Sequence, residues 1–162
     1  MFRYVHTNII AKDASKLINF YKTVFHCQSI NETRDLRGAW LDRLTGLHEA
    51  HITGEHLLLP GYGKEHPTLE IFSYDTLQET TFAGINRPGI AHIAFEVDDV
   101  EATLQEIISA GGSSVGELVT APYPDGMEAV FVYAKDPEGN IIELQSWRKL
   151  KERQIDVTMP YL

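Results

Sequence analysis

Two stretches of the chain repeat one pattern of apolar and polar positions, a short apolar strand followed by a polar cap and a helical stripe. Residues 5–10 and 90–97 predict the strands, and Asp13 and one of Asp98 or Asp99 are placed to cap the helices. The apolar stripes are Leu17, Ile18, Tyr21 and Phe25 in the first helix, and Val100, Leu104, Ile107 and Ile108 in the second. Each stretch therefore predicts a strand that runs into an amphipathic helix.

Strand-like segments separated by turn residues follow each helix. After the first helix they are 28–31, 38–44, 56–59 and 68–74, and after the second they are 115–119, 127–135 and 140–147. Each half is therefore predicted to fold as a βαβββ module, which makes the chain an α+β protein. The expected organisation is a first module at 1–80, a connector at 81–88, a second module at 89–147 and a C-terminal tail at 148–162.

The two modules carry a histidine at the same place. His6 and His92 are 86 positions apart, and the capping residues Asp13 and Asp99 have the same separation. Each histidine lies in the first predicted strand of its module. If the modules pair about a pseudo-twofold axis, equivalent strands face one another and the two imidazoles converge. This placement makes both histidines candidate metal ligands.

The last predicted strand of each module contains one carboxylate among apolar residues, Glu70 in the first module and Glu143 in the second. A carboxylate buried alone in an apolar site is costly, and a cation compensates its charge. Two imidazoles with two carboxylates suit one divalent ion such as zinc, nickel, cobalt, manganese or ferrous iron. The residues therefore predict one metal site made of His6, Glu70, His92 and Glu143, and they indicate no other cofactor.

Composition and charge limit the partners of the chain. It has 162 residues, 43% of them hydrophobic, which fits one domain built from both modules. With 14 basic and 23 acidic residues the formal net charge is -9, so a nucleic-acid backbone would be repelled. Cys27 is the single cysteine, and we find neither a signal peptide nor a membrane span in the sequence. The expected partner is a small-molecule substrate, and the expected location is the cytoplasm.

The remaining histidines are interpreted as surface or loop residues, with the alternative that one of the four in the middle of the chain lines a pocket. They are His26, His48, His51, His56 and His66. His48 and His51 resemble the paired histidines of a metalloprotease helix, but they are three positions apart where that motif needs four.

Three segments of the chain resemble the glyoxalase/bleomycin-resistance/dioxygenase superfamily, also called vicinal oxygen chelate proteins, and in particular its lactoylglutathione lyases. The segments are 6–13 together with Asn19-Phe20-Tyr21, then 89–99, and finally 136–144. The resemblance covers about residues 4–147. It implies two paired βαβββ modules whose mixed sheets curl into a cup around a metal site, and a homodimer is expected.

The resemblance also implies an activity. Lactoylglutathione lyase and methylmalonyl-CoA epimerase hold their metal at positions that match His6, Glu70, His92 and Glu143. The expected protein is a metal-dependent lyase or isomerase that acts on a small oxygenated metabolite through a metal-stabilised enediolate. Of the two carboxylates, Glu143 is the first candidate for the catalytic base and Glu70 the second.

Two other functions remain open within this superfamily. A ferrous-iron dioxygenase of the extradiol type needs two histidines and one carboxylate, and a fourth ligand at Glu70 disfavours it. A non-catalytic protein that binds a small molecule such as an antibiotic lacks the ligand set. Glutathione is disfavoured as a substrate component, because Ile10 and Tyr74 stand where similar lyases hold it with Arg and Asn.

Overall fold

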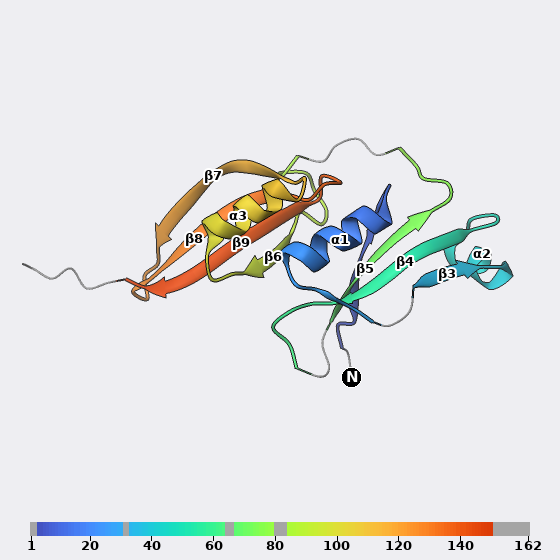
Figure 1. Ribbon diagram of the computed structural model, residues 1–162, viewed down its shortest axis with the longest axis horizontal. Helices are drawn as coiled ribbons and strands as arrows, with labels where there is room; N and C mark the ends of the chain where they lie inside the picture. The colour runs from blue at the N-terminus through green and yellow to red at the C-terminus, as the bar shows by residue number, and fades with distance from the viewer. Residues whose placement is uncertain (1–2, 31–32, 64–66, 80–83, 151–162) are drawn as a thin grey trace, which may run out of the picture.

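The computed structural model describes residues 3–30, 33–63, 67–79 and 84–150, and they form two mixed sheets, each packed against one long helix (Figure 1). The α+β class and the paired βαβββ arrangement predicted from the sequence are confirmed. Parts of the predicted connector and tail, residues 81–83 and 151–162, lie outside the described residues, as does His66.

The first sheet has the strand order β1-β5-β4-β2, and β3 also pairs with β4. Its strands are β1 (His6–Ile10), β2 (Gln28–Ser29), β3 (Arg34–Arg37), β4 (His51–Leu58) and β5 (Thr68–Tyr74). The covering helix α1 (Ala14–Val24) begins at the predicted cap, where the side chain of Asp13 accepts a hydrogen bond from the N–H of Lys16 at 2.9 Å. Leu17 and Tyr21 on its inner face are fully buried, so the predicted apolar stripe is the face that meets the sheet.

The second sheet repeats this arrangement with the order β6-β9-β8-β7. Its strands are β6 (Ile93–Glu96), β7 (Ser113–Pro122), β8 (Met127–Lys135) and β9 (Ile141–Lys149). The covering helix α3 (Val100–Ser109) is capped by Asp99, whose side chain accepts from the N–H of Ala102 at 2.9 Å. The first strand is parallel to the last strand in both sheets. Both sheets therefore place the first strand of the module at one edge, beside the last.

The middle of the first module differs from the prediction. Residues 38–44, expected as a strand, belong to the short helix α2 (Ala39–Thr45). Gly46 adopts the left-handed conformation (φ 72°) and donates its N–H to the carbonyl of Asp42 at 2.8 Å, which ends the helix. Within α2 only Leu41 is buried, in a cluster with Ala50, Ile52 and Phe72, and Asp42 accepts a hydrogen bond from the N–H of Ala50 at 2.9 Å. The strand prediction was wrong: the N–H groups of Leu41 and Asp42 bond to the carbonyl of Gly38 within the segment, as in a helix, and not to another strand.

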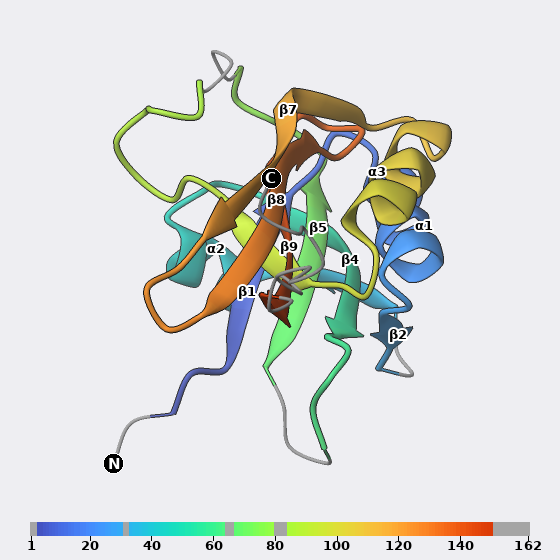
Figure 2. The ribbon, with the colours of Figure 1, turned by 90° about the vertical axis from the view of Figure 1, so that its left-hand side faces the viewer.

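A shared core joins the two modules. The helices α1 and α3 lie side by side (Figure 2), and the rings of Phe25 and Phe95 stack between the modules with centroids 4.0 Å apart. The hydroxyl of Tyr21 donates to Oδ2 of Asp136, in the turn between β8 and β9, at 3.0 Å. Asp136 is only 3% exposed, and burial raises the pKa of its carboxyl group. The modules are therefore packed as one unit rather than joined by a linker alone.

The Tyr21 hydroxyl gives a test of this packing. Tyr21→Phe is expected to lower the free energy of unfolding by about 1–3 kcal/mol, because it removes one donor from a buried carboxyl group. Urea unfolding followed by tryptophan fluorescence measures the change. Tyr123→Phe is the matched control, since Tyr123 is 38% exposed, and it should change the value by less than about 0.5 kcal/mol. Equal losses in the two variants would show that the Tyr21–Asp136 hydrogen bond stabilises the fold no more than an exposed tyrosine hydroxyl does.

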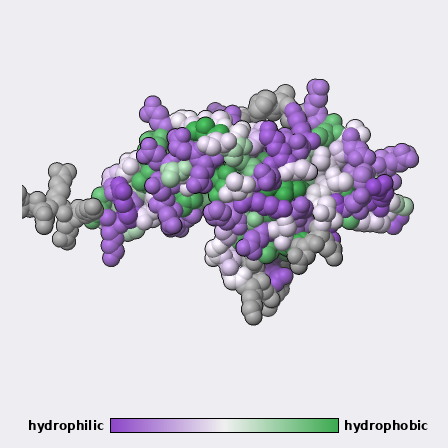
Figure 3. Space-filling view, viewed as in Figure 1, coloured by the Kyte–Doolittle hydropathy of each residue, from purple (hydrophilic) through white to green (hydrophobic). Residues whose placement is uncertain are grey.

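One face of the molecule is largely polar. Hydrophilic side chains cover most of the face seen in Figure 3, with smaller hydrophobic areas between them. Among the described residues, no helix is long and apolar enough to cross a membrane.

Candidate metal centre

The first candidate half-site lies on the face of the first sheet that points away from α1. Side chains alternate along β5, so Leu69 and Ile71 enter the core while Glu70 points to the opposite face. Glu70 pairs with Asn8 of β1 on one side and with His56 of β4 on the other. Three adjacent strands therefore place polar side chains around one carboxylate.

Glu70 has a separate partner for each oxygen. Its Oε1 lies 2.9 Å from Nε2 of His56, and its Oε2 lies 3.3 Å from Nε2 of His6. The side-chain amide of Asn8 also donates to Oε2 at 3.3 Å. Burial lowers the pKa of His56, and the negative charge of Glu70 acts in the opposite direction. The carboxylate side chain is 11% exposed, so these contacts replace most of its hydration.

The second half-site lies on the equivalent face of the second sheet. Nε2 of His92 lies 3.3 Å from Oε2 of Glu143, the same separation as between His6 and Glu70. Tyr133 of β8 pairs with Glu143 across the sheet, and this neighbouring carboxylate is the main reason why the pKa of Tyr133 is raised. The rings of Tyr133 and His92 are also in contact, with centroids 5.3 Å apart. Glu143 therefore has an imidazole and a phenol as neighbours.

The backbone register makes the two half-sites equivalent. In the first sheet Glu70 pairs with Asn8, two positions after His6, and in the second Glu143 pairs with Ala94, two positions after His92. The carboxylates also have equivalent partners on the antiparallel strand next to them. His56 of β4 pairs with Glu70, and Tyr133 of β8 pairs with Glu143. Each histidine thus reaches its carboxylate diagonally from the edge strand.

The spacing within each half-site fits two ligands of one metal ion. Two ligands bound at about 2.0–2.1 Å to a tetrahedral ion lie about 3.3–3.4 Å apart. The imidazole nitrogen and the carboxylate oxygen are separated by 3.3 Å in both pairs. Each pair therefore matches half of a four-ligand site in both chemistry and spacing.

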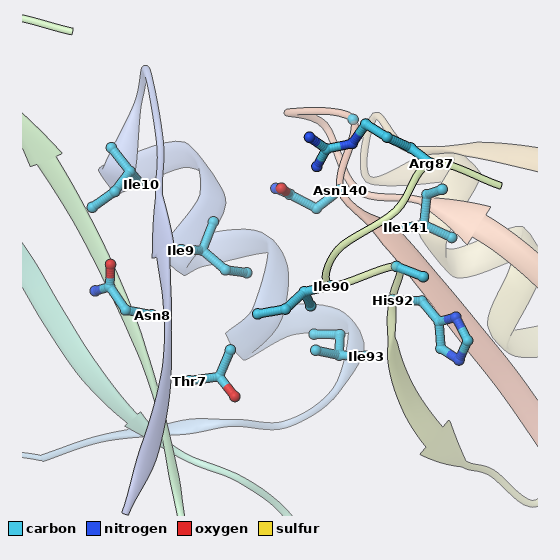
Figure 4. A pocket seen from close by; sticks show the side chains of 12 residues that line it. Thr7, Asn8, Ile9, Ile10, Arg87, Ile90, His92, Ile93, Asn140 and Ile141 are labelled. Carbon is cyan, nitrogen blue, oxygen red and sulfur yellow. The ribbon is translucent and has the colours of Figure 1, made fainter. Parts of the chain in front are cut away.

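The structure brings the four predicted ligands together as two pairs and not as one cluster. In the described ranges, no group of three or more His, Cys, Asp or Glu side chains is placed to hold a metal ion. A pocket of about 270 Å³ lies between the modules, bordered by residues 7–10 of β1, by Arg87, by 90–93 and by 139–141. Across it, Asn8 and His92 point in opposite directions (Figure 4). One chain in this conformation therefore presents two separate half-sites.

Two residues of these half-sites, His56 and Tyr133, were not predicted from the sequence. The interpretation of His56 as a surface or loop residue was wrong, because it lies within β4 and its side chain is 21% exposed. Tyr133 was not singled out, since nothing distinguishes it from other aromatic residues in a strand. Only the register of the last two strands of each module, which depends on the connecting turn, places both residues opposite the carboxylates.

His51 was also interpreted as a surface or loop residue and lies instead at the start of β4. Its Nδ1 contacts both carboxylate oxygens of Asp75 at 2.9 Å, and its Nε2 lies 2.9 Å from Asp35. These contacts raise the pKa of His51. They link β3, β4 and the end of β5, so His51 belongs to a network separate from Glu70.

Two βαβββ modules in equivalent register, with one His–Glu pair in each, define the chain as a protein of the paired-module glyoxalase fold. It belongs to the Glyoxalase/Bleomycin resistance protein/Dioxygenase superfamily, whose family model matches residues 3–144. The resemblance seen in the sequence is thereby confirmed. No curated protein matches the sequence at a significant level.

Solved structures support the same fold. A glyoxalase family protein from Bacillus cereus superposes with a TM-score of 0.76 at 21% identity, covering 93% of this chain and 96% of that chain. Glyoxalase I from Zea mays gives a TM-score of 0.59 at 22% identity, covering 88% of this chain and 44% of that chain. The fosfomycin resistance protein FosX from Listeria monocytogenes, in complex with Mn(II) and sulfate, gives 0.50 at 19% identity, covering 90% and 91%. At these identities the likeness establishes the fold alone.

Proposed function

We propose that the protein is a metal-dependent lyase or isomerase that moves a proton at the carbon next to a carbonyl group of a small oxygenated metabolite. The observation that carries the proposal is the pair of equivalent His–Glu contacts, each at 3.3 Å. Membership of a superfamily that includes glyoxalase I, and the Mn(II) in the FosX structure, support it.

His6, Glu70, His92 and Glu143 would hold one divalent ion. When bound, the ion supplies a Lewis acid that polarises the substrate carbonyl and stabilises the negative charge that develops on its oxygen. The ligand set of two nitrogens and two oxygens suits zinc, nickel, cobalt, manganese or iron.

The two half-sites would meet between two copies of the chain. Rotation of one module against the other would have to break the stacked Phe25–Phe95 pair and the buried Tyr21–Asp136 bond. Tyr4 and Ile90, each two positions before a ligand histidine, are 65% and 83% exposed. Large apolar residues at equivalent positions suit an interface between like surfaces. We therefore propose a homodimer in which each metal site takes one half from each chain.

The proposed base is Glu143, because its carboxylate is held less firmly than that of Glu70. Glu70 contacts His6, Asn8 and His56 and its side chain is 11% exposed. Glu143 contacts His92 and Tyr133 and its side chain is 17% exposed. A carboxylate oxygen of Glu143 would take the proton from the substrate carbon and return it to the same or the neighbouring carbon, while Glu70 stays in place.

Complementation between two inactive variants tests the metal site and the dimer together. One chain carries His6→Ala with Glu70→Ala, and the other carries His92→Ala with Glu143→Ala. Each variant alone should bind no metal. A mixed dimer, isolated through two different tags, should regain one intact site, or about half the metal of the unmodified dimer by elemental analysis.

Two results would contradict the proposal. A mixed dimer without metal, beside an unmodified protein that binds it, would place the whole site within one chain. An unmodified protein that binds no divalent metal would instead favour the non-catalytic binding protein.

A further inference from the structure

The two carboxylates of the proposed metal site each have a polar aromatic or imidazole neighbour on the adjacent strand. His56 pairs with Glu70 between β4 and β5, and Tyr133 pairs with Glu143 between β8 and β9. These positions are equivalent in the two modules, and both side chains lie on the same face of the sheet as the carboxylate. The family relationship and the proposed activity assign neither residue a role.

The geometry around Glu70 separates its two oxygens. Nε2 of His56 lies 2.9 Å from Oε1, whereas Nε2 of His6 and the side-chain amide of Asn8 lie 3.3 Å from Oε2. Metal binding between His6 and Glu70 would therefore use Oε2 and leave the contact with His56 intact. His56 must carry its proton on Nε2 in order to donate to the carboxylate.

The ring of His56 is itself held in place. It packs edge-on against Phe72 with centroids 5.5 Å apart, and its centroid is 6.3 Å from that of His6. The ring of Tyr133 is similarly packed against His92. Because packing fixes both rings, their contacts with the carboxylates also limit how the carboxylates can turn.

We infer that His56 and Tyr133 are positioning residues, each of which holds one oxygen of the opposite carboxylate so that the other oxygen faces the ligand histidine and the metal. This inference rests on the proposed function. The two positions differ in chemistry, since one half-site has an imidazole N–H and the other a phenol O–H. Neither residue binds the metal itself.

Cobalt(II) binding to the purified dimer tests the inference, because both the affinity and the visible absorption of the complex can be measured without a substrate. His56→Leu removes the donor at similar side-chain size, and Tyr133→Phe removes only the hydroxyl. Each should weaken cobalt binding by about 10–100-fold, the usual effect of losing a hydrogen bond to a metal ligand. His56→Gln keeps an N–H near the position of Nε2 and should restore the affinity.

The absorption spectrum separates a positioning residue from a ligand. All three variants should keep the band shape of the unmodified complex, because the four ligands are unchanged. An unchanged affinity in folded His56→Leu and Tyr133→Phe would overturn the inference. An altered band shape in both His56→Leu and His56→Gln would overturn it as well, since His56 would then be a ligand. If the unmodified protein bound no cobalt, the proposed function itself would fail.

Discussion

Glu143→Gln is expected to lower turnover by about 100- to 10,000-fold, the range that a general acid–base group contributes. The amide keeps the shape of the side chain and an oxygen for the metal, but it cannot accept a proton from carbon. Exchange of substrate hydrogen for solvent deuterium measures the step directly. The metal-loaded protein would be incubated in heavy water with a panel of 2-oxo compounds and their thiol adducts, and followed by NMR.

Two matched variants show whether the loss of exchange in Glu143→Gln comes from the loss of the catalytic base. Glu117→Gln makes the same chemical change at an exposed position of β7 and should leave exchange unaltered. Glu70→Gln should mainly weaken metal binding, because Glu70 is held by His6, Asn8 and His56. If Glu70→Gln retained its metal but lost exchange while Glu143→Gln remained active, the roles of the two carboxylates would be reversed.

Gly54→Ala should be the most destabilising small substitution in the first sheet, with a loss of about 3–5 kcal/mol in the free energy of unfolding. A Cβ atom at Gly54 would lie 2.0 Å from the carbonyl oxygen of Ile71 and 2.9 Å from Cα of Phe72. Both atoms belong to the backbone of β5, so neither moves without parting the strands. The φ of Gly54, 149°, adds conformational strain.

Gly116→Ala is the control that separates the steric clash of an added Cβ atom from the backbone strain of a positive φ. Gly116 has a φ of 72°, but a Cβ atom there meets nothing within 4 Å, so only the backbone strain of about 1–2 kcal/mol applies. Urea unfolding of both variants gives the comparison. A loss of 3–5 kcal/mol is a large part of the roughly 5–15 kcal/mol that stabilises a typical domain. Equal losses in the two variants would show that β4 and β5 make room for the added Cβ atom without a further loss in the free energy of unfolding.

Strong periodicity made much of the fold predictable. The strand predicted at 68–74 has the observed bounds of β5, and both predicted helix caps are in place at Asp13 and Asp99. The prediction failed at 38–44 and missed β3. The sequence of β3, Arg-Asp-Leu-Arg, has a single apolar residue, so no alternation marks it as a strand. Its pairing with β4 depends on a long-range contact that local sequence does not encode.

The candidate site was predictable as two equivalent pairs but not as an assembled whole. The repeat relates His6 to His92, and the isolated carboxylates mark Glu70 and Glu143. The two pairs stay apart within one chain because of the packing of α1 against α3 and contacts such as Phe25–Phe95, which no local pattern indicates. The site residues therefore remain a prediction, supported by the spacing within each pair.

The difference between His56 and Tyr133 has a consequence for how a substrate is oriented. A metal cup with two identical halves would accept a substrate equally in two orientations related by its pseudo-twofold axis, and would offer either carboxylate as the base. An imidazole beside one carboxylate and a phenol beside the other makes those orientations unequal in energy. In the proposed reaction, this departure from internal symmetry would favour one orientation and so give the two carboxylates different roles.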